Sequence, residues 1–135
     1  MIYLTEDMFK SGQPASQGEV LIWMKKYAPA GILKAMSGLK LSEMKLEKGQ
    51  MILGHSESGH HHVMEPVREM PISKACLALI DAANDSFIEL RLAEDCKLVH
   101  QRGHDTHKTF VFPPGEYIRG IREEQSIEGW RRVAD

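Results

Sequence analysis

Histidine is the residue type in this sequence best suited to chemistry, because neutral imidazole binds transition metals and titrates near physiological pH. All seven histidines lie between residues 55 and 107. Four fall within GHSESGHHHVME, residues 54–65, and three within VHQRGHDTHKTF, residues 99–110. Two such clusters favour a metal or catalytic site over the alternative of solvated loop histidines.

The spacing within each cluster suits two ligands that share one ion. If residues 60–64 are extended, His60 and His62 lie on one face about 7 Å apart, so their rings can converge. His104 and His107 can converge across a turn. If the clusters meet on neighbouring strands, four nitrogens become available to zinc, nickel or iron at about 2.0–2.2 Å. The other three histidines are expected to be bystanders: His55, His61 and His100.

Carboxylates near the first cluster add the possibility of general acid and base catalysis. Glu57 and Glu65 can each act as a catalytic base beside an imidazole, or hold a ring in one tautomer. Spacing alone does not separate catalysis from ligation, so enzymatic activity stays open. Four protein ligands would suit a closed structural site, whereas three ligands and a water would leave an open catalytic position.

Strands are expected to position these side chains, because turn signals separate short apolar runs from residue 39 onward. Residues 75–80 and 87–92 predict a hairpin, since apolar and charged residues alternate in FIELRL. Residues 39–53 predict another hairpin about Lys48-Gly49-Gln50. Residues 109–112 and 116–122 predict two strands about Pro113-Pro114-Gly115.

This pattern predicts a fold that is all-β or mostly β. The expected architecture is a small antiparallel barrel or sandwich, with minor helical content near the N-terminus. Residues 16–28 fit either a short strand or a capped helix. Nothing in the chain divides it, so residues 1–135 are expected to form a single domain.

Composition limits the classes of partner. The formal charge of −2 provides no basic face for nucleic acid. No apolar run is long enough to span a membrane, and the cytoplasm is the expected location. Cys76 and Cys96 are expected to be buried apolar thiols. Four arginines near the C-terminus predict either a strip that binds a small anionic ligand or a solvated strand face: Arg119, Arg122, Arg131 and Arg132. The sequence leaves open whether the protein is a homo-oligomer.

The segment from Gly54 to Glu65, with His60-x-His62 inside it, resembles the first metal motif of the cupin superfamily. That resemblance implies a double-stranded β-helix barrel with an ion in its mouth. Two intervening residues separate His62 from Glu65, where the motif has three or four. Ile118 stands where the second motif has histidine, so His104 or His107 would supply a third ligand.

About the last 85 residues are similar to a family of small uncharacterised bacterial and phage proteins. The family pattern is GHxH, HxxH, PPGxY and an arginine-rich terminal strand. The resemblance implies a compact β-rich domain and implies no reaction. The positions of this sequence that match the family pattern are His60, His62, His104, His107, Tyr117, Arg119, Arg122 and Glu123.

Three hypotheses about function follow. The leading one is a small cytosolic protein that binds one transition-metal ion through His60, His62 and one or both of His104 and His107. The second is a cupin-like metalloenzyme, an oxidoreductase, isomerase or hydrolase, that acts on a small polar substrate with Glu57 or Glu65 as base. The third is an interaction or regulatory module, associated with phage, in which the histidines only stabilise a loop.

Overall fold

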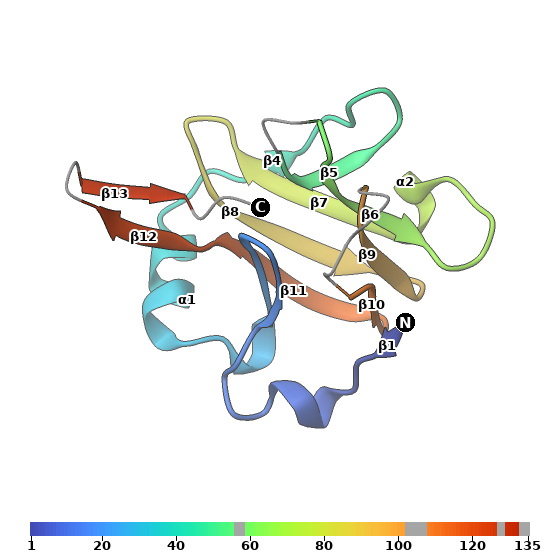
Figure 1. The fold of residues 1–135 in the computed structure, drawn as a ribbon, viewed down its shortest axis with the longest axis horizontal. Helices are drawn as coiled ribbons and strands as arrows, with labels where there is room; N and C mark the ends of the chain where they lie inside the picture. The colour runs from blue at the N-terminus through green and yellow to red at the C-terminus, as the bar shows by residue number, and fades with distance from the viewer. Residues whose placement is uncertain (56–58, 102–107, 127–128, 133–135) are drawn as a thin grey trace.

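The computed structural model describes residues 1–55, 59–101, 108–126 and 129–132, and Figure 1 shows their arrangement. Its strands are β1 Ile2–Tyr3, β2 Ala15–Gln17, β3 Val20–Met24, β4 Ser42–Glu43, β5 Met51–Gly54, β6 His62–Pro66, β7 Cys76–Asp81, β8 Asn84–Leu92, β9 Cys96–His100, β10 Phe110–Phe112, β11 Gly115–Ile121, β12 Glu123–Ser126 and β13 Gly129–Arg132. Its helices are the α-helices α1 Ala30–Ser37 and α2 Ile72–Ala75 and the 3-10 helices η1 Glu6–Phe9 and η2 Lys25–Tyr27.

Two sheets form the body of the fold. Sheet A has the order β1-β10-β9-β6-β5, and sheet B has the order β2-β3-β11-β8-β7-β4. Neighbouring strands are antiparallel except β1 and β10, which run parallel. A separate ribbon of β12 and β13 extends away from the sheets (Figure 1). The prediction of a mostly β fold is therefore confirmed.

The two sheets of the described chain do not close into a barrel, so that alternative is wrong for these residues. No pairing joins a strand of sheet A to a strand of sheet B among the registers observed in the described residues. The closed barrel that the cupin resemblance implies is absent from this part of the chain for the same reason. Burial of apolar side chains, rather than strand pairing, holds the sheets together.

The main core lies between the sheets and follows from period-two alternation along their strands. In β3, Val20, Ile22 and Met24 are buried in this core, and in β8 Leu90 is fully buried. Sheet A contributes apolar residues of β6, β9 and β10 to the same cluster, Met64 among them. Residues 20–24 are therefore a strand, which settles the choice that residues 16–28 left open.

Helix α1 covers part of the outer face of sheet B. Pro29 precedes the helix, a position where a missing N–H costs nothing. Met36 of the helix is buried in a second small apolar cluster with Ile118 of β11 and Ala28. Trp23, from β3, packs against this cluster. The outer face of sheet B is thus apolar where α1 lies and carries charged residues beyond it.

Two predicted turns have different outcomes. Pro113-Pro114-Gly115 connects β10 to β11 as expected, and Tyr117 donates its hydroxyl to the Pro113 carbonyl at 2.6 Å. Residues 39–53 do not form the expected hairpin, because β4 pairs with β7 in sheet B whereas β5 pairs with β6 in sheet A. Only the Glu47–Gln50 bridge about the turn is formed.

The helices of the described residues include none that is long and apolar enough to cross a membrane.

Candidate functional site

Strands β6 and β9 bring the two histidine clusters together. Their antiparallel register pairs His62 with His100, and the two imidazole rings stack with centroids 4.1 Å apart and planes 5° apart. Both residues are buried, with exposed fractions of 0% and 5%. They lie at even spacing from Met64 and Leu98, which are in the main core, so the rings face the interior between the sheets.

The side chain of Gln17, at the end of β2, fixes the orientation of the His62 ring. Its amide nitrogen donates to the backbone carbonyls of Leu98 at 3.0 Å and Lys108 at 2.9 Å. Because carbonyl oxygens only accept, the amide oxygen must be the atom that lies 2.8 Å from His62 Nδ1. His62 Nδ1 is therefore the protonated nitrogen, and a neutral His62 carries its lone pair on Nε2.

His100 has the opposite tautomer when neutral. Its Nε2 lies 3.0 Å from the backbone carbonyl oxygen of His60, so Nε2 donates a proton to that oxygen. The backbone N–H of Gln101 also donates to the His61 carbonyl at 2.9 Å. These two bonds attach the segment that precedes β6 to the end of β9, so the first cluster is held against the strand that leads into the second.

Gly54 provides the space in which His62 is buried. Gly54 pairs with His62 across β5 and β6, at a place where the register shifts. A Cβ at this position would lie 2.5 Å from Val20 Cγ2 and 3.1 Å from His62 Cδ2. Such contacts are too close for a side chain, so glycine allows β3 of sheet B to approach sheet A beside the imidazole.

The predicted ligands occupy different surroundings. His62 is buried as a site residue should be, whereas His60 is exposed and precedes the strand, which begins at His62. The expected extended run therefore starts two residues later than predicted. His104 and His107 lie outside the described residues. His100, expected to be a bystander of the metal site, stacks directly on the His62 ring.

His55 and His61 form a separate contact at the surface. His55 Nε2 lies 2.7 Å from Glu47 Oε2, and the rings of His55 and His61 meet edge to face with centroids 5.2 Å apart. The His55 and Glu47 side chains are each more than half exposed. This contact does not include the buried histidine pair, so His55 and His61 provide matched controls for it.

Of the two predicted catalytic carboxylates, the structure describes Glu65, which does not join the buried pair. Glu65 lies at odd spacing from His62 on β6, so it points to the opposite face of the strand. There it is half-buried and lies 4.0 Å from Lys97 Nζ. Glu57 lies outside the described residues. Glu65, the one of the two that the structure describes, therefore does not lie beside His62 as a catalytic base.

Three of the predicted terminal-strand residues, Tyr117, Arg119 and Arg122, make contacts within the fold. Tyr117 is fully buried in the main core, and burial raises the pKa of its hydroxyl. Arg119 is buried and donates to the backbone carbonyls of Asp85 and Ser86. Arg122 is exposed and donates to the Ser16 hydroxyl at 2.6 Å. The side chains of Glu123, Arg131 and Arg132 lie outside the described residues, so the anion-binding strip stays a prediction.

The hydrogen bonds of the pair define the tautomer of both neutral rings. His62 Nε2 has the lone pair that ligates a metal ion or accepts a proton. His100 does not suit the same ion, because the ring planes are 5° apart and the in-plane lone pairs of two stacked rings cannot point toward one position. Within residues 1–55, 59–101 and 108–122, no three histidine, cysteine, aspartate or glutamate residues form a group able to hold a metal.

Sequence reasoning missed two residues of this site, Gln17 and His100. Gln17 sits in a polar turn-like stretch with no feature that distinguishes it from other loop glutamines. The pairing of His100 with His62 depends on strand register, which the histidine spacing does not reveal. No family model, curated protein or solved structure matches the chain.

Proposed function

We propose that this protein binds one divalent transition-metal ion at the end of sheet A where β6 begins and β9 ends. His62 Nε2 is the central ligand, and His60 together with one or both of His104 and His107 completes the set. Zinc, nickel and iron all suit neutral imidazole. The observation that carries the proposal is the buried His62 ring, whose Nδ1 is held by Gln17 so that Nε2 has the lone pair.

An outer partner of this kind is typical of metal-binding histidines. The second nitrogen of a ligating ring usually donates to a carboxylate, a carbonyl or water, which fixes the tautomer and the ring orientation. Gln17 Oε1 accepts in the same way, and two backbone carbonyls hold the glutamine amide in place. The orientation of His62 is therefore established before any ion binds, which reduces the entropy lost on ligation.

The connectivity supports the choice of the other ligands. In the sequence, His104 and His107 lie between β9, which ends at His100, and β10, which begins at Phe110. Chain geometry limits the Cα of His104 to about 14 Å from that of His100, since an extended chain spans at most about 3.6 Å per residue. The backbone carbonyl of His60 accepts a hydrogen bond from His100 Nε2. Both sets of candidate ligands therefore originate within reach of the buried pair.

Metal analysis of two double variants tests this proposal. The protein is purified without a nickel column, stripped with a chelator and titrated separately with Zn²⁺, Ni²⁺, Fe²⁺ and Co²⁺. Inductively coupled plasma mass spectrometry then measures the metal retained after dialysis. We expect one ion per chain and a visible Co²⁺ spectrum of nitrogen coordination. His104→Ala/His107→Ala should abolish both signals, whereas His55→Ala/His61→Ala should retain them.

Two outcomes would refute the proposal. Wild-type protein that retains no zinc, nickel or iron after reconstitution would show that the ordered His62 ring serves packing alone. Equal loss of metal in the two double variants would show that the ion binds the surface histidines instead. Circular dichroism of each variant establishes that the fold is intact, and His62 itself is left unchanged because its burial makes a folding defect the expected result of its replacement.

A further inference from the structure

A hollow of about 890 Å³ opens between the N-terminal segment, the end of β3, α1 and the turn before β11. This volume lies in the range of sites for small organic molecules, about 300–1,000 Å³. Its apolar lining includes Leu4, Met24 and Leu33, and Leu33 is 37% exposed although it is a large aliphatic residue. Pro113 and Pro114 add further apolar surface and present no N–H groups.

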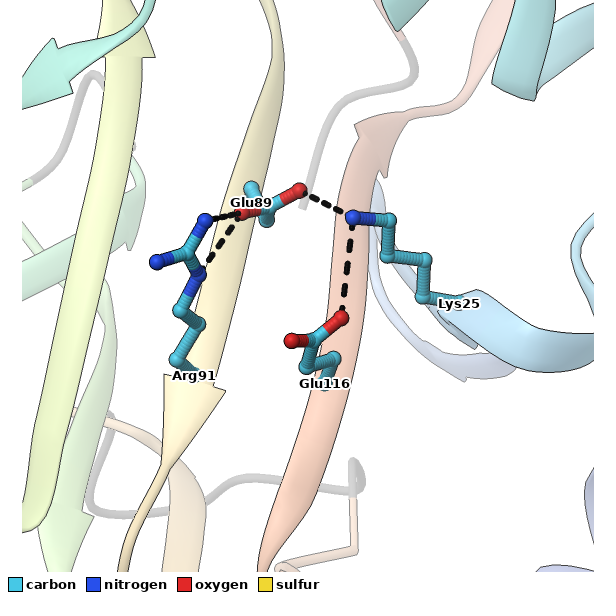
Figure 2. A network of polar contacts seen from close by, with 4 residues as sticks. All are labelled: Lys25, Glu89, Arg91 and Glu116. Atoms are coloured by element: carbon cyan, nitrogen blue, oxygen red, sulfur yellow. Dashed lines mark hydrogen bonds and ion pairs between the residues drawn. The ribbon is translucent and has the colours of Figure 1, made fainter.

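A single cation is anchored at the wall of this hollow. Lys25 Nζ lies 2.7 Å from Glu89 Oε1, and Glu89 is 4% exposed. Glu89 also accepts from Arg91 through Nε at 2.9 Å and Nη2 at 2.8 Å. Figure 2 shows the Glu89 carboxylate between the two cations, with Lys25 reaching across to Glu116. The hydrogen bond to Glu89 raises the pKa of Lys25, so the ammonium stays charged at neutral pH.

The other charged groups of the lining are held less firmly. Glu116 lies 3.5 Å from Lys25 Nζ and its side chain is 54% exposed. Lys26 and Glu6 pair at 3.2 Å with side chains 68% and 50% exposed. Exposed pairs of this kind contribute little and exchange readily with solvent. Lys25 is therefore the charged group of the lining whose position a buried partner fixes.

This asymmetry determines which ligand charge fits. A carboxylate can displace the exposed Glu116 from Lys25 while Glu89 keeps the ammonium in place. An ammonium ligand would have to recruit Glu6 or Glu116, which have no buried partner to hold them. A polyanion such as a nucleotide is disfavoured, because two lysines and two glutamates line the hollow and their charges cancel.

We propose that this hollow binds an amphipathic monocarboxylate, with its carboxylate on Lys25 and its apolar body over Leu4, Met24 and Leu33. The site shares no residue with the histidine pair, so the result of its test does not depend on whether the protein binds a metal. The apolar body contributes the burial of hydrocarbon and of the exposed face of Leu33. The carboxylate contributes a charge-assisted hydrogen bond to an ammonium that is already oriented.

Calorimetric titration with matched ten-carbon probes tests this site. Decanoate should bind at one site per chain, and decylammonium should bind at least about tenfold more weakly, the effect expected when one charge-assisted bond is lost. Lys25→Met should lower decanoate affinity by a similar factor and should not weaken decylammonium binding, because it removes a positive charge and frees Glu116. Lys45→Met, at an exposed lysine outside the lining, should change neither affinity.

A second pair of variants locates the apolar body. Leu33→Glu places a carboxylate on the exposed side of α1 and should abolish decanoate binding without unfolding the chain. Met8→Glu, at a residue that is 53% exposed and lies outside the lining, should have no effect. Equal affinity for decanoate and decylammonium, undisturbed binding to Leu33→Glu, or no binding of decanoate would each overturn the proposal. Thermal melting of each variant confirms that it is folded.

Discussion

Replacement of Gln17 by leucine should reveal how much the buried amide contributes to the fold. Leucine has a similar size and no polar atoms, so the change removes three hydrogen bonds of 2.8–3.0 Å. It leaves His62 Nδ1–H and the carbonyls of Leu98 and Lys108 without this partner. Each buried polar group left unsatisfied costs about 1–3 kcal/mol, and the apolar leucine recovers part of that cost.

The net destabilisation expected for Gln17→Leu is about 2–4 kcal/mol. For 135 residues this corresponds to a melting temperature lower by about 7–14 °C. Urea unfolding followed by circular dichroism gives the free energy, and Gln13→Leu, at an exposed glutamine, is the matched control. A loss below about 1 kcal/mol, no greater than that of the control, would refute the assigned network.

Gln17→Glu tests the orientation of the amide. The substitution keeps the size of the side chain and replaces the NH₂ group, which donates to both carbonyls, with an acceptor. At neutral pH an ionised glutamate would place two acceptors against each other, so we expect Gln17→Glu to be at least as destabilising as Gln17→Leu. If metal binds as proposed, Gln17→Leu should also weaken zinc affinity by about 10–100-fold.

Three further predictions concern other parts of the structure. Gly54→Ala should cost about 1–3 kcal/mol, because its Cβ would lie 2.5 Å from Val20 Cγ2, and thermal melting measures the loss. Burial acts to raise the pKa of Glu89, but the hydrogen bonds from its lysine and arginine partners hold it below the ordinary value. The stability that this carboxylate contributes is therefore present above about pH 4.3, its unfolded pKa, and is lost as pH falls through the folded pKa. Glu89→Gln should consequently destabilise the protein by about 1–3 kcal/mol at pH 7 and by less in acid. A pH series of urea titrations that shows a constant difference would contradict this. Burial raises the pKa of Cys76 and of Cys96 to about 12, so both thiols should resist alkylation at pH 8 until urea unfolds the chain, and rapid labelling of folded protein by iodoacetamide would show that they are accessible.

Strands that pack one face on the core could be predicted from the sequence. In FIELRL, residues 87–92, alternation places Ile88, Leu90 and Leu92 in the core and leaves Glu89 and Arg91 on the other face, and residues 76–81 pair with this strand. The alternation is visible because it is a property of each strand alone. The turn at Pro113-Pro114-Gly115 could be predicted for the same reason, because it depends on the types of adjacent residues alone.

Pairings between distant segments could not be predicted in this way. Lys48-Gly49 makes the predicted turn, with φ of +52° and +78°, yet its flanking strands join different sheets. Gln17 meets His62 across 45 residues and Leu98 across 81. No local pattern specifies such contacts, because they depend on which strands become neighbours. The clustering of histidines indicated where a site would lie, and strand register determined that His100 joined it.

The position of β3 between β2 and β11 in sheet B affects how the protein folds. Its two neighbours are β2, which precedes it directly, and β11, whose Ile121 pairs with Val20. Ile2 likewise pairs with Phe110. Contacts between segments so far apart in sequence slow folding, because a long loop must close before they form. During synthesis, the apolar strand VLIWM therefore lacks its partner β11 until residues 115–121 have left the ribosome, and in that interval the unpaired strand is open to aggregation or to capture by a chaperone.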